Sequence, residues 1–169
     1  SDQAFQPDPD KSSPYLYRGA PYSNKVDLHP AISYLDQAIQ INPDNAYAYY
    51  NRGRAYRDKL YPYTALARSS EAIQLDPDFA LAYINRGGAY ADKGDPDRAI
   101  VDLDRAIQLD PNNAGAYYNR RRAYYNKGDL DRAIADYDKA IQINPDNADA
   151  YYNRGLAYNN KGDLNRAIA

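Results

Sequence analysis

The segment Tyr49-Tyr50-Asn51-Arg52-Gly53 indicates the fold, because variants of it return along the chain at a fixed spacing. The later copies are Tyr83-Ile84-Asn85-Arg86-Gly87, Tyr117-Tyr118-Asn119-Arg120-Arg121 and Tyr151-Tyr152-Asn153-Arg154-Gly155. A second recurring unit reads Ala-Ile-Gln, then Ile or Leu, then Asn or Asp, then Pro; it fills residues 38–43, 72–77, 106–111 and 140–145. A period of about 34 residues indicates one supersecondary unit stacked on copies of itself.

Each repeat has the pattern of two helices joined by a turn. Tyr117, Arg120 and Tyr124 lie three and four residues apart, so they share one helical face. Gly128 is suited to a left-handed helix end and Asp129 to the N-cap of the next helix. The second helix carries an apolar stripe made of Leu130, Ile134, Tyr137, Ile141 and Ile143. The sequence therefore predicts an all-α chain of helix pairs.

The recurring residues resemble the tetratricopeptide repeat. That family has a large aromatic residue at the fourth position, a small residue at the eighth, Tyr at the eleventh, Ala at the twentieth and twenty-seventh, and Pro at the thirty-second. The aromatic residues at the fourth position are Tyr15, Tyr49, Tyr83, Tyr117 and Tyr151. The prolines are Pro43, Pro77, Pro111 and Pro145. The resemblance implies a right-handed α-solenoid of antiparallel helix pairs.

The register divides the chain into a polar, proline-containing arm at residues 1–11 and a repeat domain at residues 12–169. The predicted repeats span residues 12–45, 46–79, 80–113, 114–147 and, in part, 148–169. The first repeat is imperfect, because Pro21 falls in the interior of its first helix, which we expect to be short, kinked or absent. The fifth repeat stops at Ala169, within its second helix, so we expect residues 164–169 to fray or to be held by another molecule.

Composition argues against several classes of function. The formal net charge is -2 with no basic stripe, which disfavours nucleic-acid binding, and no apolar run is long enough to span a bilayer. The chain has no cysteine and one histidine, His29, so we expect no enzyme activity, no metal site and no cofactor. The absence of both cysteine and an initiating methionine is compatible with a processed extracytoplasmic protein.

By the resemblance, a concave groove is lined by residues of the first helix of each repeat. The predicted groove residues are Tyr50, Asn51, Arg54, Asn85, Tyr118, Asn119, Arg122, Tyr152 and Asn153. Asparagine can pair with an extended peptide backbone, tyrosine adds contact area and arginine binds carboxylates, which favours a peptide ligand, including an acidic one. The alternative is that the recurring asparagines only hydrogen-bond neighbouring helices. The positions do not resemble the carboxylate clamp that binds chaperone C-termini.

Two departures from the family pattern concern arginine. An arginine stands at the seventh position of every repeat, where its stem can pack between helices while its head reaches a carboxylate such as Asp102 or Asp136. Arg121 replaces the small eighth residue, where the paired helices come closest. Overpacking there predicts local splaying of the helices or a side chain turned outward.

Two functions of different classes fit the sequence. The first is a non-catalytic scaffold that binds a peptide or protein partner along its concave groove. The alternative is a structural subunit that assembles head to tail into an oligomer or filament, with one solenoid end docking on the other. The predicted self-association residues are Tyr15, Leu16, Tyr22, Leu156, Leu164 and Ile168.

Overall fold

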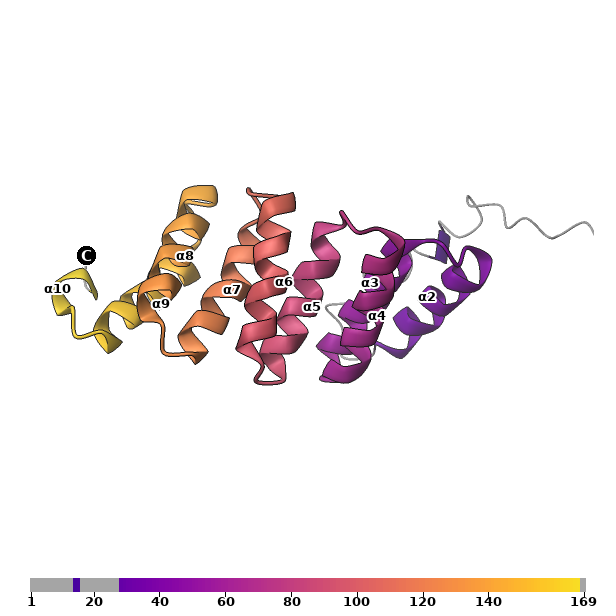
Figure 1. Cartoon of the computed structure of the whole chain (residues 1–169), viewed down its shortest axis with the longest axis horizontal. Helices are drawn as coiled ribbons and strands as arrows, with labels where there is room; N and C mark the ends of the chain where they lie inside the picture. Colours follow the sequence, from indigo (N-terminus) through magenta and orange to yellow (C-terminus); the bar gives the residue numbers. More distant parts are fainter. Residues whose placement is uncertain (1–13, 16–27, 168–169) are drawn as a thin grey trace, which may run out of the picture. The chain divides into compact units, whose positions relative to one another are not determined.

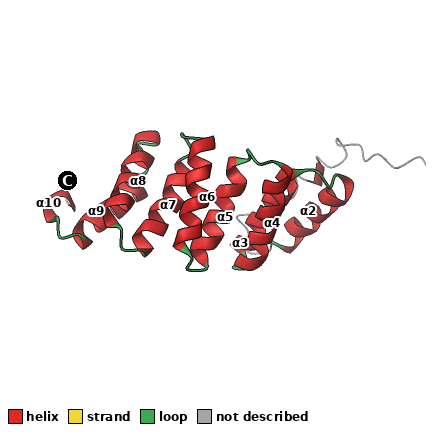
Figure 2. Cartoon of the chain, viewed as in Figure 1, coloured by secondary structure: helices red, strands yellow, loops and turns green. Residues whose placement is uncertain are grey.

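The computed structural model describes residues 14–15 and 28–167. Figure 1 labels the helices along the chain, and Figure 2 shows that the described elements are helices joined by loops. The bounds are α2 (His29–Ile41), α3 (Ala46–Asp58), α4 (Pro62–Leu75), α5 (Ala80–Asp92), α6 (Pro96–Leu109), α7 (Ala114–Asn126), α8 (Leu130–Ile143), α9 (Ala148–Asn160) and α10 (Leu164–Ala167). Residues Ala46, Ala80, Ala114 and Ala148 thus begin successive first helices at the spacing of the sequence repeat, and the all-α prediction is confirmed.

The helix ends follow from local sequence chemistry. Gly94, Gly128 and Gly162 adopt positive φ values of 77°, 78° and 83°, which glycine tolerates because it lacks a Cβ. Asp129 then caps α8: its carboxylate accepts hydrogen bonds from the backbone N–H of Arg132 (3.2 Å) and from the Arg132 guanidinium (2.6 Å). The backbone hydrogen bond is the main cause that lowers the pKa of Asp129, so the cap is charged at neutral pH. The predicted roles of Gly128 and Asp129 are confirmed.

The described residues form two compact units, which divide between Asn85 and Arg86. In the first unit, α3 packs against α2 and α4. Its buried core includes Tyr50, Ala72 and Ala82, with Phe79 against Tyr50 at 5.3 Å between ring centroids. Gly53 is needed at the close approach of α3 and α4, since a Cβ there would lie 3.0 Å from Ser69 Oγ.

In the second unit, α7 packs against α6 and α8, and α9 against α8 and α10. The buried side chains of α8 include Ile134 and Tyr137, which pack on Ala150 and Ala157 of α9. Small alanines at these contacts let the helices approach closely, as the sequence pattern requires. The described helices are too short or too polar to cross a membrane.

Several predictions concern residues outside the described part of the chain. The polar arm at residues 1–11 and the expected distortion at Pro21 both lie there. Of the predicted self-association residues, Leu16, Tyr22 and Ile168 lie there as well. The last helix of the described residues is α10.

Candidate interaction surface

The first helices of the second unit, α7 and α9, carry five of the predicted groove residues. We call Tyr118, Asn119, Arg122, Tyr152 and Asn153 the candidate face. Tyr118 is 43% exposed and Tyr152 is 68% exposed, while both asparagines are half-buried. Asn119 Nδ2 donates to the carbonyl of Gly115 (2.8 Å), and Asn153 Nδ2 donates to the carbonyl of Asp149 (2.7 Å). These bonds lie within the residue's own helix and orient the amide groups.

The corresponding residues of the first unit lie deeper. Tyr50, Asn51 and Asn85 are buried, whereas Arg54 is half-buried. Asn51 Nδ2 donates to the carbonyl of Tyr47 (2.8 Å), and Asn85 Nδ2 donates to Ser69 Oγ of α4 (2.9 Å). Asn85 therefore makes the bond to a neighbouring helix that the alternative interpretation proposed. A groove shared by all nine residues stays a prediction.

Polar contacts connect successive first helices within the second unit. Arg122 Nη2 of α7 donates to Asp92 Oδ1 at the end of α5 (2.6 Å) and lies 3.3 Å from the carbonyl of Gly88. Asn160 Nδ2 of α9 donates to the hydroxyl of Tyr125 on α7 (2.6 Å). Hydrogen bonds thus hold Arg122 of the candidate face, and Tyr125 and Asn160 on the same two helices, in fixed positions.

Of the two alternatives predicted for Arg121, the outward side chain is wrong, and splaying of the helices stays a prediction. Its side chain is not turned outward: the residue is 9% exposed, and its guanidinium carbon lies 4.1 Å from the centre of the Tyr118 ring and 4.7 Å from that of Tyr137. The physical reason is a matched change on α8. Gly87 faces Leu103 one repeat earlier, whereas Arg121 faces the flat ring of Tyr137, on which a planar guanidinium stacks.

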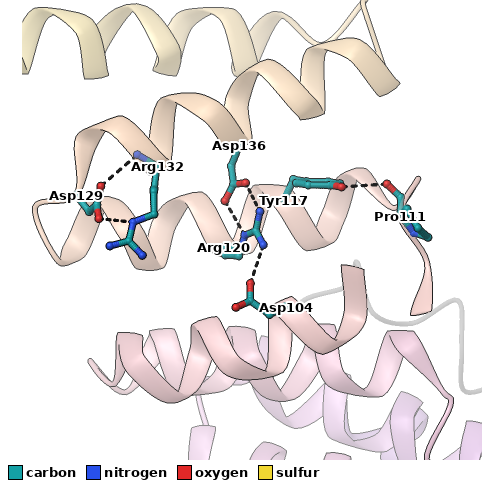
Figure 3. A network of polar contacts seen from close by, with 7 residues as sticks. All are labelled: Asp104, Pro111, Tyr117, Arg120, Asp129, Arg132 and Asp136. Atoms are coloured by element: carbon teal, nitrogen blue, oxygen red, sulfur yellow. Dashed lines mark hydrogen bonds and ion pairs between the residues drawn. The ribbon is translucent and has the colours of Figure 1, made fainter. Parts of the chain in front are cut away.

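The described arginines at the seventh position, from Arg52 onward, form a ladder of ion pairs, shown for α7 in Figure 3. Arg120 Nε and Nη2 donate to both carboxylate oxygens of Asp136 (2.9 and 2.6 Å), and Nη1 donates to Asp104 (2.6 Å). Arg86 likewise binds Asp102 through two hydrogen bonds of 2.8 Å. The prediction that these heads reach Asp102 and Asp136 is confirmed, and the ladder is a structural element.

Burial is the largest influence on both groups of the Arg120–Asp136 pair. It raises the pKa of Asp136, a rise that the Arg120 hydrogen bonds oppose. Burial also lowers the pKa of Arg120, but the hydrogen bonds to Asp136 and Asp104 exceed that effect and raise it overall. The guanidinium is therefore charged, and Asp136 is its nearly buried counter-ion.

Comparisons with known proteins agree with this architecture. A model described as TPR repeat matches residues 28–59 and 122–162, and two described as tetratricopeptide repeat match residues 80–113 and 103–135. Among solved structures, one of MamA protein is 31% identical with a TM-score of 0.77, and the similarity covers 94% of this chain and 87% of that one. The chain belongs to the tetratricopeptide repeat family.

Two further solved structures share this repeat fold. YrrB, described as a TPR protein with an unusual peptide-binding site, is 25% identical with a TM-score of 0.69, over 93% of this chain and 81% of YrrB. The pilF protein of Pseudomonas aeruginosa is 18% identical with a TM-score of 0.86, over 95% of this chain and 73% of that one, and shows likeness of fold alone. No curated protein matched the chain.

Sequence reasoning within the tetratricopeptide pattern missed one side chain near the candidate face, Tyr137, which stacks on Arg121. Tyr125 and Asn160 stand at groove positions of the same pattern, and their side chains join α7 to α9. A signal for Tyr137 was present, because the chain has Ser69 and Leu103 at the equivalent place in earlier repeats. Reading the eighth residue together with the residue sixteen positions later would have paired Arg121 with Tyr137.

Proposed function

We propose that this chain is a non-catalytic interaction module that binds an extended protein segment on the candidate face of its second unit. The observation that carries the proposal is the exposure of Tyr118 and Tyr152 on successive first helices, where Tyr125, Tyr151 and Leu156 are exposed as well. Tyrosine offers a large contact area and has few rotatable bonds to immobilise on binding. An exposed pair of tyrosines on successive first helices is therefore suited to hold a partner chain.

The polar members of the face support the same reading. Asn119 and Asn153 are only half-buried, and an amide can both donate to and accept from a peptide backbone. Arg122 contributes a planar donor group that Asp92 holds in position. YrrB, which shares the fold at 25% identity, is described as having a peptide-binding site, and this likeness makes a peptide ligand a natural first test.

The test is selection of peptides from a displayed random library on the purified full chain, followed by affinity measurements on variants. We expect Tyr152→Ala to weaken binding of the selected peptides by at least about tenfold, because hot-spot tyrosines carry much of such an interface. Tyr63→Ala is the matched control, since Tyr63 is an exposed tyrosine on α4, outside the face. Selected peptides that bind Tyr118→Ala and Tyr152→Ala as tightly as the unchanged protein would refute the proposal.

Head-to-tail self-assembly is the second candidate. The observation that favours it is the exposure of Leu156 and Leu164, two apolar side chains on α9 and α10. Tyr15, the predicted docking residue that is described at the other end, is half-buried. Light scattering over a dilution series separates the two functions: assembly requires a mass that rises with concentration and falls in Leu164→Asp, whereas a constant monomer mass rules assembly out.

A further inference from the structure

Among the described residues, Arg121 is a buried cation without a counter-ion. Its described contacts are the rings of Tyr118 and Tyr137 and one hydrogen bond, from Nη1 to the Tyr137 hydroxyl (2.5 Å). Its Nε is buried and has no hydrogen-bond partner. Within the described part of the chain, no carboxylate forms an ion pair with it, although Arg120 and Arg122 on the same helix each have one or more.

Such an arrangement is costly unless something compensates for it. Burying an unpaired charge is unfavourable by several kcal/mol, and stacking on two tyrosines returns only about 1–2 kcal/mol each. The repeat does not require the arginine, because Gly53, Gly87 and Gly155 occupy the same place in other copies. The guanidinium, which has no carboxylate partner among the described residues, is thus suited to an anion from outside the chain.

A cavity lies where such an anion would be needed. It has a volume of about 180 Å³ and is lined by Arg121, Tyr125, Tyr137, Asn153 and Leu156. At roughly 30 Å³ for each water, that volume holds a carboxylate together with two or three methylene groups. Tyr125 and Asn153 add polar atoms to the wall and Leu156 adds an apolar side. These features match a short acidic side chain or a chain terminus.

We propose that this cavity is an anion pocket in which Arg121 binds a carboxylate of the partner protein segment. The inference rests on the proposed function and deepens it, because Asn153 belongs to both the pocket and the candidate face, and Tyr118 of the face stacks on Arg121. The two rings hold the planar guanidinium before the ligand arrives, so little conformational entropy is lost on binding. The segment that binds the face therefore carries an acidic side chain or ends in its carboxylate at this point.

Three small probes test the pocket and distinguish the two sources of carboxylate. N-acetylglutamate amide presents a side-chain carboxylate, N-acetylglutamine presents a terminal one, and N-acetylglutamine amide presents neither. We expect one of the two acids to shift the side-chain Nε–Hε resonance of Arg121 saturably in a titration followed by NMR. The neutral amide should bind at least about tenfold more weakly. Equal response to all three probes, or response to none, overturns the proposal.

Variants separate the pocket from general attraction between charges. Arg121→Gln should lose the saturable response, which is then followed through the backbone amides of Tyr125 and Asn153. If that variant does not fold, Arg121→Gly with Tyr137→Leu decides the matter, because it reproduces the Gly87–Leu103 pair already present in the chain. The control is Arg132→Gln, which removes an exposed guanidinium stacked on Tyr124 and should leave the response unchanged. A response that survives in the double variant overturns the proposal.

These experiments distinguish failure of the anion pocket from failure of the proposed interaction module. A pocket that binds an acid in a chain that selects no peptide refutes the interaction module but leaves the anion pocket in place. Conversely, peptides that need Tyr152, carry no acidic group and bind the double variant unchanged refute the pocket but leave the module in place.

Discussion

Arg120 and Arg121 are neighbours on α7 with opposite electrostatic surroundings. Arg120 donates to two carboxylates, one from α6 and one from α8. Arg121 instead lies between two aromatic rings with its charge uncompensated by the described residues. Adjacent positions on a helix point about 100° apart, which is why one side chain enters the ladder and the other the cavity. Sequence alone predicted the first environment, since the arginine recurs, but not the second, because Arg121 and Tyr137 occur in one repeat only.

The ladder gives a prediction at the scale of single residues. We expect Asp136→Ala to lower the free energy of unfolding by about 2–3 kcal/mol, because it leaves the buried side of Arg120 without its counter-ion. Asp138→Ala is the matched control: this carboxylate is also on α8 and also binds an arginine sixteen residues away, but it is 51% exposed. Asp138→Ala should lower the free energy of unfolding by less than about 1 kcal/mol. Urea unfolding measures both, and equal losses would contradict this account.

The turn between α3 and α4 differs from the equivalent turns of the later repeats in the residue that adopts a left-handed conformation. Leu60 has a φ of 62°, at the place where the later repeats have Gly94, Gly128 and Gly162. The hydrogen bond that closes the turn is the same, from the N–H of Tyr61 to the carbonyl of Tyr56 (2.9 Å). A left-handed conformation strains a residue that has a Cβ, so tertiary packing and not local propensity holds this turn.

Replacing this leucine should relieve the strain. We expect Leu60→Gly to raise the free energy of unfolding by about 1 kcal/mol, after the extra entropy of glycine in the unfolded chain is counted. Leu60→Ala is the control, because it removes most of the exposed side chain but keeps the Cβ, and it should change stability little. Urea unfolding followed by circular dichroism measures both. If alanine stabilised the protein as much as glycine, the strain would come from the leucine side chain and not from the backbone conformation.

At the scale of the whole molecule, stability is expected to vary along the chain. Energy in repeat proteins comes mostly from contacts between adjacent elements. Helix α8 packs against both α7 and α9 and contains five buried residues, whereas the four residues of α10 contain none. The helix pairs and their spacing could be predicted from sequence because they depend on this local repetition. The pocket could not, because its walls come from α7, α8 and α9, and Arg121 and Tyr137 do not recur.

Amide hydrogen exchange tests this gradient. We expect the amides of the central repeats, residues 46–147, to be the most protected, and those of α10 to exchange at least about a hundredfold faster than those of α8. The comparison uses the unchanged chain at a concentration where it is monomeric. Protection of α10 equal to that of α8 would contradict nearest-neighbour stability and would point to a partner that covers this helix.

The spacing of the ion pairs has a consequence for how such a protein changes over generations. Asp104 and Asp138 stand one repeat apart, and each lies sixteen residues before the arginine it binds. Unequal recombination that adds or removes the codons of one full repeat therefore gives the next arginine a carboxylate at the same distance. A shift by a few codons instead changes the sixteen-residue distance of the pair that spans the junction. Repeat number can thus change in single heritable steps, without a new interface having to arise first.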